Sequence, residues 1–270
     1  MIGWNLARRT AAGVARGDRL ADAFEGWKGK DERWLFVAPH DDDLCLGAGL
    51  LMLKAVEEGI PVHVVITTDG RMGYGSTTPQ DQIVTVRKVE TLDSFQILGV
   101  SDVKWLDFPD GSLARHAGVR EAREGDPCVV GGQTGIQNAF TAKLREHRPT
   151  RVFVPAGSDL HPDHKTVHQE LLISLFHAAG DIWPQLGEPL ASVPDIYEMA
   201  IYCDFTAPPT IRLTAPSAAF ERKLDSVLAY RSQQQIASLV ENVRKSGPVE
   251  FFRPADFHLY VPAVYNSLFD

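Results

Sequence analysis

Residues 34–58 read WLFVAPHDDDLCLGAGLLMLKAVEE, and this stretch decides the fold class. It opens with a continuous apolar run, Trp34 to Val37, that is typical of a short buried strand ending at Pro39. Gly47 to Glu58 follows with apolar residues at helical spacing, which predicts a helix. A buried strand that leads into a helix predicts the beginning of a βαβ unit.

The alternation of strand and helix continues along the chain. Runs rich in β-branched and apolar residues predict strands at residues 62–67, 103–108 and 151–154. Helical spacing predicts helices over residues 80–98, over 135–147 and from Pro162 to Ala178. Strands that alternate with helices indicate a Rossmann-like α/β fold, in which helices cover both faces of a mostly parallel, doubly wound sheet.

Other segments interrupt this pattern. We expect residues 1–30 to form an N-terminal helical extension, with one or two short helices on the outside of the fold, and residues 31–270 to form a single α/β domain. Residues 111–134 are rich in glycine and charge, which predicts a long loop or lid.

The last part of the chain predicts three further features. Residues 196–202 and 210–213 are expected to form a late strand pair, antiparallel at an edge of the sheet. Residues 218–245 are strongly helical in pattern, and the aromatic tail from Val249 is expected to dock on the core.

The composition excludes several classes of protein. Lys and Arg number 27 and Asp and Glu 35 in 270 residues, and the resulting charge of −8 opposes attraction to phosphate backbones, so we expect no nucleic-acid partner. No apolar run approaches the roughly 20 residues of a membrane span, so no transmembrane segment is expected. The three cysteines fit neither a disulfide framework nor a zinc finger, and the N-terminal residues lack the apolar stretch of a signal peptide. We therefore expect a cytoplasmic protein.

The first predicted strand ends in His40-Asp41-Asp42-Asp43, one imidazole and three consecutive carboxylates. Open α/β sheets bind ligands at the carboxyl ends of their strands. Adjacent carboxylates repel one another unless a cation or hydrogen-bond donors compensate, so a metal site is one interpretation. The alternative is an acidic turn that caps the following helix.

A second cluster favours the metal. Residues 155–164 read PAGSDLHPDH and again lie between a strand and a helix, so the two clusters can face each other at one edge of the sheet. Catalytic zinc sites use three protein ligands and leave a fourth position open, a set that His40, Asp43 and His164 would supply. Taken alone, the second cluster could be a helix start with Pro162 in its first turn.

This pair of motifs resembles the LmbE-like deacetylases, also called the PIG-L or N-acetylglucosaminyl-phosphatidylinositol de-N-acetylase family. Their first motif is similar to His-Pro-Asp-Asp-Glu and their second is His-Pro-Asp-His; this chain has HDDDL at 40–44 and HPDH at 161–164. The resemblance runs from about Arg33 to Ala178, and AYRSQ at 229–233 looks like the family's late Ser-Gln helix. It implies a zinc-dependent enzyme that hydrolyses N-acyl groups, mostly from amino sugars.

The resemblance also implies roles for the matching residues. His40, Asp43 and His164 match the ligands of one zinc ion per chain, and Asp42 matches the general base. Such a zinc keeps net positive charge and lowers the pKa of a bound water toward about 7, which prepares the water to attack an amide carbonyl.

His161 is the candidate donor to the oxyanion and to the leaving amine, and Asp163 would hold its tautomer and orientation. Two further positions depart from the family pattern. Asp41 stands where the family usually has Pro, so it could compete with Asp42 as base. Asp159 stands where some relatives have a tyrosine that polarises the substrate carbonyl; Tyr74 is the candidate replacement, with a packing or lid role as the alternative.

Arg87 and Asp110 are the predicted substrate contacts. Arg87 and Glu90 match the family's Arg-x-x-Glu, and Asp110 matches an acidic residue in the loop after the next strand. Arg and Asp side chains suit the hydroxyls of a sugar, because they form charge-assisted hydrogen bonds. The alternative is that Arg87 and Glu90 are a surface pair one helical turn apart.

The leading hypothesis is zinc-dependent hydrolysis of an N-acetyl group on an amino sugar or sugar conjugate, a small-molecule substrate. One alternative is a metal-dependent hydrolase of another amide or of a phosphoester, and another is a non-catalytic module that binds a metal or a sugar. A second copy of the chain is a further candidate partner, since residues 111–134 and 196–213 could complete or cover the cleft in a homo-oligomer.

Overall fold

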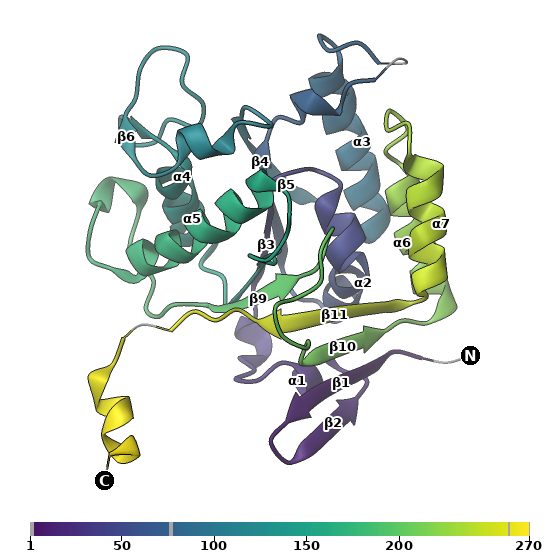
Figure 1. The fold of residues 1–270 in the computed structure, drawn as a ribbon, viewed down its shortest axis with the longest axis vertical. Coiled ribbons are helices and arrows are strands. Elements are labelled where there is room, and N and C mark those ends of the chain that lie inside the picture. The colour runs from purple at the N-terminus through teal and green to yellow at the C-terminus, as the bar shows by residue number, and fades with distance from the viewer. Residues whose placement is uncertain (1–2, 76–77, 259, 270) are drawn as a thin grey trace.

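The computed structural model describes residues 3–75, 78–258 and 260–269. Its centre is a nine-stranded sheet, with helices packed on both faces (Figure 1). The strands of this sheet are β1 (Asn5–Thr10), β2 (Gly13–Gly17), β3 (Trp34–Ala38), β4 (Val62–Thr68), β5 (Asp102–Phe108), β8 (Arg151–Pro155), β9 (Asp195–Met199), β10 (Ile211–Thr214) and β11 (Val249–Pro254). The short strands β6 (Arg120–Glu121) and β7 (Gln133–Thr134) pair separately. The α-helices are α1 (Leu20–Ala23), α2 (Asp43–Glu57), α3 (Ile83–Leu98), α4 (Ile136–His147), α5 (Pro162–Ala179), α6 (Ser217–Leu228) and α7 (Ile236–Ser246).

The strands lie in the order β2-β1-β10-β11-β9-β8-β3-β4-β5 across the sheet. The half from β9 to β5 is parallel, and the other half is joined to it through antiparallel pairs. The predicted α/β fold is therefore confirmed, with a mixed sheet whose parallel half carries the alternating strands and helices.

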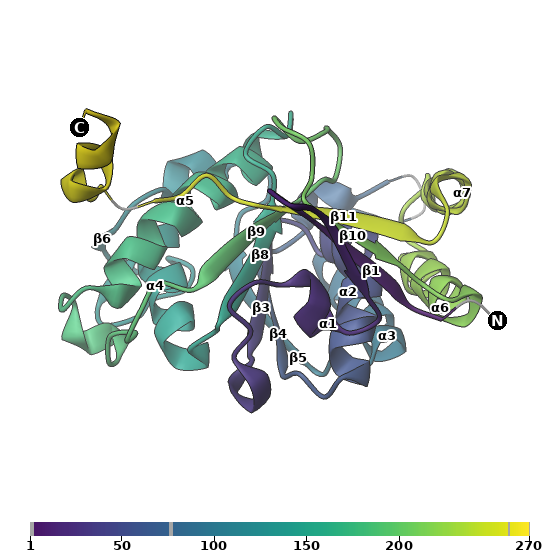
Figure 2. The same ribbon diagram turned by 90° about the horizontal axis from the view of Figure 1, so that it is seen from below.

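The central strand β3 is buried on both faces, which explains its continuous apolar sequence. Trp34, Phe36 and Ala38 face one core, and Leu35 and Val37 face the other. Because side chains alternate along a strand, β3 supplies both cores at once. Helices α2, α3, α6 and α7 cover one face of the sheet, and α4 and α5 pack together on the other (Figure 2).

The N-terminal segment differs from the prediction. Residues 5–17, expected to be helical, form the β1–β2 hairpin, and β1 pairs with β10. Only the short helix α1 and a single 3-10 turn at Gly29–Asp31 are helical between β2 and β3. The hairpin covers the edge of β10, a long-range pairing that outweighs the local helical preference of Ala and Arg. The proposed boundary at residue 31 remains a prediction.

The late strands also differ from the prediction. β9 and β10 do not pair with each other, because β11 lies between them, and β9 lies in the middle of the sheet beside β8. The tail from Val249 docks only through its first part, because β11 is a strand of the central sheet. Docking is wrong for residues 260–269, which are exposed and form a 3-10 turn apart from the sheet (Figure 1). The loop predicted at 111–134 is confirmed apart from the short strands β6 and β7 and a 3-10 turn at Leu113–His116.

The single helix predicted over 218–245 is wrong, since α6 and α7 are separated by a turn at 229–235. At Ser232 the backbone N–H donates to the buried Glu90 carboxylate at 2.8 Å, so the helical hydrogen-bond pattern is interrupted there. Within the described part of the chain, no helix is long and apolar enough to cross a lipid bilayer.

Candidate metal centre and active site

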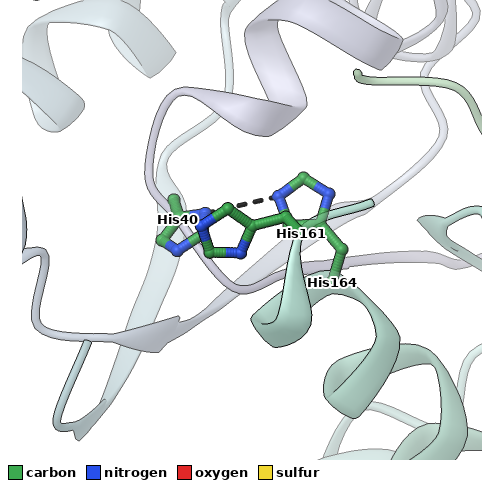
Figure 3. Close-up of side chains that lie close together, drawn as sticks. All are labelled: His40, His161 and His164. Atoms are coloured by element: carbon green, nitrogen blue, oxygen red, sulfur yellow. Dashed lines mark hydrogen bonds between the residues drawn. The ribbon is translucent and has the colours of Figure 1, made fainter. Parts of the chain in front are cut away.

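The two sequence clusters meet at the carboxyl ends of neighbouring strands. β3 and β8 are adjacent and parallel, so the turns that follow them lie side by side. Asp43 begins α2, His161 is the N-cap of α5, and His164 lies in the first turn of α5. Figure 3 shows the imidazoles of His40, His161 and His164 grouped together. The expectation that residues 40 and 164 face each other is confirmed.

Three side-chain atoms form a nearly equilateral triangle. His40 Nδ1 lies 3.2 Å from Asp43 Oδ2, Asp43 Oδ2 lies 3.3 Å from His164 Nε2, and His164 Nε2 lies 3.3 Å from His40 Nδ1. For a tetrahedral zinc with bonds of about 2.0–2.1 Å, the ligand atoms are separated by about 3.3–3.4 Å. These residues therefore fit a tetrahedral metal site with one position left open.

The charges around this triangle also fit a cation. The Oδ1 atom of Asp43 is buried and has no hydrogen-bond partner among the described residues. Burial alone would raise the pKa of Asp43, but the adjacent His164 and His40 outweigh burial and lower it. Burial likewise disfavours the charged form of His40, yet Asp43, Asp110 and Asp163 raise its pKa well above the usual range. Asp43 places its negative charge in the triangle itself, whereas Asp110 and Asp163 face the other nitrogen of His40.

Carboxylates lie next to the second nitrogen of both histidine ligands. Nε2 of His40 lies 3.2 Å from Asp110 Oδ1 and 3.6 Å from Asp163 Oδ2, which leaves Nδ1 directed into the triangle. Metal-binding histidines usually have such a partner on the second nitrogen, which fixes the tautomer and the ring plane. Nδ1 of His164 lies 3.3 Å from Asp159 Oδ2, but it is buried and makes no hydrogen bond within the described chain. The contact of Asp110 with His40 gives this residue a position beside the metal triangle in addition to its predicted role in substrate binding.

His161 lies beside the triangle, with its ring 4.7 Å from the ring of His40. It is close enough for one of its nitrogens to join His40 and His164 as a ligand. However, the backbone N–H of Asp163 donates to Nδ1 of His161 at 3.2 Å, so a neutral ring carries its hydrogen on Nε2. The carboxylate of Asp163 contacts the Gly111 N–H and His40, so the tautomer of His161 is set by the Asp163 backbone.

Asp41 and Asp42 have different surroundings. Arg87 binds both carboxylate oxygens of Asp41, one of them through Nε at 2.9 Å, and Thr91 donates to the same group at 3.2 Å. Arg87 is 4% exposed and reaches Asp42 only at 3.5 Å. These contacts occupy Asp41, so Asp42 is the better candidate for the general base.

Asp42 lies on the wall of a pocket of about 380 Å³, which we call the substrate pocket. Burial raises the pKa of Asp42 more than the nearby Arg87 lowers it. Gln233 donates a hydrogen bond to Asp42 Oδ2, and the Tyr230 hydroxyl donates to the backbone carbonyl of Asp41 at 2.6 Å. The segment predicted as a Ser-Gln helix is thus a turn that holds this wall.

Two tyrosines border the substrate pocket. Tyr74, the predicted oxyanion residue, lies on its wall and is 47% exposed. Tyr202 also lines the pocket, and its ring stacks on the imidazole of His164 with the ring centroids 5.2 Å apart. The carboxylate of Asp159 holds this arrangement, because it accepts hydrogen bonds from the backbone N–H groups of Tyr202 and His161, each at 3.0 Å. Tyr202 is not among the residues predicted from the sequence, since an aromatic residue in a loop carries no motif.

A second group of metal-binding residue types lies where β4 and β5 begin, at the opposite end of the strands. His63 Nδ1 is 2.6 Å from Asp102 Oδ2, and the ring of His147 lies 4.4 Å from the ring of His63. His63 therefore has a hydrogen-bond partner in Asp102, and His147 completes a group of three that no sequence motif marks.

The fold and the site define an α/β protein with a candidate metal centre at the carboxyl edge of its sheet. The family model for GlcNAc-PI de-N-acetylase, PIG-L, matches residues 35–174, and the chain belongs to this family. The family predicted from the two motifs is confirmed.

Individual relatives carry related names. The chain is 31% identical over 166 residues to a 1D-myo-inositol 2-acetamido-2-deoxy-alpha-D-glucopyranoside deacetylase of Kineococcus radiotolerans, a match that covers 55% of this chain and 46% of that protein. It is 30% identical over 135 residues to a diacetylchitobiose deacetylase of Thermococcus kodakarensis, with 48% and 44% covered. The chain therefore spans about half the length of these curated relatives. In structure it is similar to the N,N'-diacetylchitobiose deacetylase of Pyrococcus horikoshii, with a TM-score of 0.67 and 24% identity over 88% of each chain, which shows a shared fold.

Proposed function

We propose that this protein removes the N-acetyl group from a small-molecule conjugate of N-acetylglucosamine, using one zinc ion held by His40, Asp43 and His164. The observation that carries the proposal is the triangle of ligand atoms with sides of 3.2–3.3 Å. The names of the two curated relatives support an N-acetylated amino sugar as the substrate class. Zinc bound there would lower the pKa of an adjacent water and polarise the amide carbonyl.

Asp42 takes the proton of the attacking water. Its raised pKa makes the carboxylate a stronger base than an exposed aspartate, and Gln233 fixes its orientation through the hydrogen bond to Oδ2. Asp41 cannot readily replace it, because both oxygens of Asp41 are held by Arg87.

His161 serves as the donor to the carbonyl oxygen and then to the leaving amine. Its hydrogen lies on Nε2, because Nδ1 accepts the backbone N–H of Asp163. Burial and the adjacent His40 and His164 lower the pKa of His161, so the ring is a neutral donor at neutral pH. As the C–N bond breaks, the imidazole gives its Nε2 proton to the amine nitrogen and regains the proton that Asp42 took from water, so the products are a free amino sugar and acetate.

The test is acetate release from a panel of N-acetylated sugars, measured with zinc added and with zinc chelated, alongside the zinc content of the protein. We expect about one zinc per chain, and we expect His164→Ala to lose both the zinc and the activity. His258→Ala is the matched control, because His258 is exposed and is not one of the residues of the metal triangle. Full zinc content and full activity in His164→Ala would refute the proposal, and close to two metals per chain would favour a phosphoesterase.

A further inference from the structure

An apolar hollow of about 570 Å³ lies beside the substrate pocket. We call it the apolar chamber; its apolar lining includes Leu46, Ile201, Phe205, Leu239, Val243 and Phe251. It lies between α2, the β9–β10 connection, α7 and β11, which are neighbours in Figure 1. These side chains are half-buried or exposed, so the chamber has an apolar wall that is open to solvent. Such concave apolar surfaces are typical of ligand sites.

The apolar chamber and the substrate pocket share three lining residues, Leu46, Tyr202 and Leu239. Tyr202 is 54% exposed at this junction and stacks on the candidate metal ligand His164. A ligand that occupies the substrate pocket can therefore extend past these side chains into the chamber.

The charges of the chamber select against an anionic group. Lys223 Nζ is 2.6 Å from Glu250 and donates to the Leu46 carbonyl at 2.7 Å, so its charge is neutralised within the wall. Asp204 is exposed and adds a further carboxylate to the lining. A phosphate or carboxylate entering the chamber would meet uncompensated negative charge.

The chamber also lies apart from the position of the scissile bond. His40, Asp42, Asp43 and His164 do not belong to its lining. Of these four residues only Asp42 lines the substrate pocket, so the amide carbonyl is expected at the Asp42 end of that pocket, and the acetyl methyl, one bond away from the carbonyl carbon, stays there. The sugar ring provides the necessary spacing, and the group attached to the sugar is the part of the substrate that can extend there.

We propose that the apolar chamber binds an uncharged alkyl or aryl group attached to the N-acetylated sugar, so that the substrate is a hydrophobic glycoconjugate. This inference rests on the proposed function, because it assigns the part of that substrate which lies away from the amide. Since the chamber is open to solvent, only part of each methylene group is removed from water, and we expect an affinity gain of about twofold per methylene.

The experiment measures, by calorimetry, the Kd for methyl, butyl and hexyl β-glycosides of N-acetylglucosamine, using the zinc-loaded Asp42→Asn protein, which should bind these compounds with little hydrolysis. Five added methylene groups should tighten binding by about 30-fold from methyl to hexyl. A terminal carboxylate on the hexyl chain should abolish the gain, a comparison that needs no further variant. Equal affinities across the series, or no measurable binding, would overturn the inference.

A substitution in the wall tests the location. Val243→Asn should reduce the hexyl-to-methyl affinity ratio to below about 10-fold, because it places an amide in the apolar lining. Val89→Asn is the matched control on α3: it makes the same change at a valine that is 54% exposed and outside both hollows, and it should leave the ratio unchanged. An unchanged ratio in Val243→Asn would overturn the assignment to this chamber.

Two further measurements separate the inference from the proposed function. The first follows acetate release from the same glycosides by the unsubstituted protein. Acetate release from the methyl compound, together with a Kd that does not depend on chain length, would support the proposed deacetylase function and overturn the inference. A chain-length effect on Kd without acetate release would support the apolar site and refute the proposed reaction. A matched series of sugars with longer N-acyl groups is measured as well. If the Kd depends on the length of the acyl chain but not on the length of the glycoside chain, the acyl chain occupies the chamber, and the assignment of the chamber to the group attached to the sugar is overturned.

Discussion

Replacing Arg87 by Met separates a structural role of this residue from the role in substrate binding that its sequence predicts. The guanidinium is 4% exposed and is bound to Asp41, whose side chain is also 4% exposed. Arg87→Met would leave this carboxylate buried without its cation, and would remove the charge 3.5 Å from Asp42. Breaking a buried ion pair by removing one partner costs about 3–5 kcal/mol, so we expect the free energy of unfolding to fall by that amount.

The neighbouring residue provides the control. Lys88 pairs with Asp107 at 2.5 Å, but the two side chains are 34% and 51% exposed. Exposed pairs contribute about 0–1 kcal/mol, so Lys88→Met should change the unfolding free energy by no more than that. Urea unfolding of both variants at neutral pH measures the difference. Equal stability of the two variants, together with a raised KM in Arg87→Met alone, would refute the structural reading and restore Arg87 as a substrate contact.

Three further perturbations test other parts of the structure. Asp42→Asn should lower kcat by about 10²–10⁴-fold with unchanged zinc content, because it removes the base and keeps the ligands; a retained kcat would show that another group acts as base. Ser232→Ala should lower the unfolding free energy by about 1–3 kcal/mol in urea, since its hydroxyl donates to the buried Glu90 at 2.6 Å; no loss would show that water replaces this bond. For Glu32, burial raises the pKa, but hydrogen bonds from Thr150 and the Lys28 backbone outweigh it and lower the pKa. The stability that ionised Glu32 adds is therefore present above the unfolded pKa of about 4.3 and is lost as the pH falls through the folded pKa. Glu32→Gln should have a clearly lower free energy of unfolding than the parent at neutral pH, and the two values should converge in acid. A difference that widens in acid would contradict this direction.

The parallel half of the sheet could be predicted because its signals are local. The run from Trp34 to Val37 is apolar without a break, since both faces of β3 are buried, and the helical spacing in α2 begins a few residues later. The two motifs after β3 and β8 could be placed together for the same reason. Parallel neighbours bring their carboxyl ends to one edge, so sequence position alone brings His40 near His164.

The antiparallel half could not be predicted, because its strands depend on distant partners. β1 lies in a segment rich in Ala and Arg and joins the central sheet because β10 offers it an edge. β11 lies between β9 and β10, although it follows both in sequence. Tyr202 was missed for a related reason: its position against His164 depends on the backbone hydrogen bond to Asp159, which lies 43 residues away.

The three consecutive carboxylates of the first motif look redundant in the sequence, yet each has a different partner in the structure. Asp41 is held by Arg87, Asp42 faces the substrate pocket beside Gln233, and Asp43 lies against His40 and His164. Successive residues at the turn into α2 point in different directions, so three identical side chains reach three different environments. The repulsion among the three carboxylates is therefore offset at separate places. The guanidinium of Arg87 compensates Asp41, whereas Asp43 faces the imidazoles of His40 and His164 and the position that fits a cation. Asp42, between these two carboxylates, lies 3.5 Å from the guanidinium that binds Asp41, and burial raises its pKa more than this guanidinium lowers it. The same run of sequence thus yields a structural anchor, a candidate base and a candidate metal ligand.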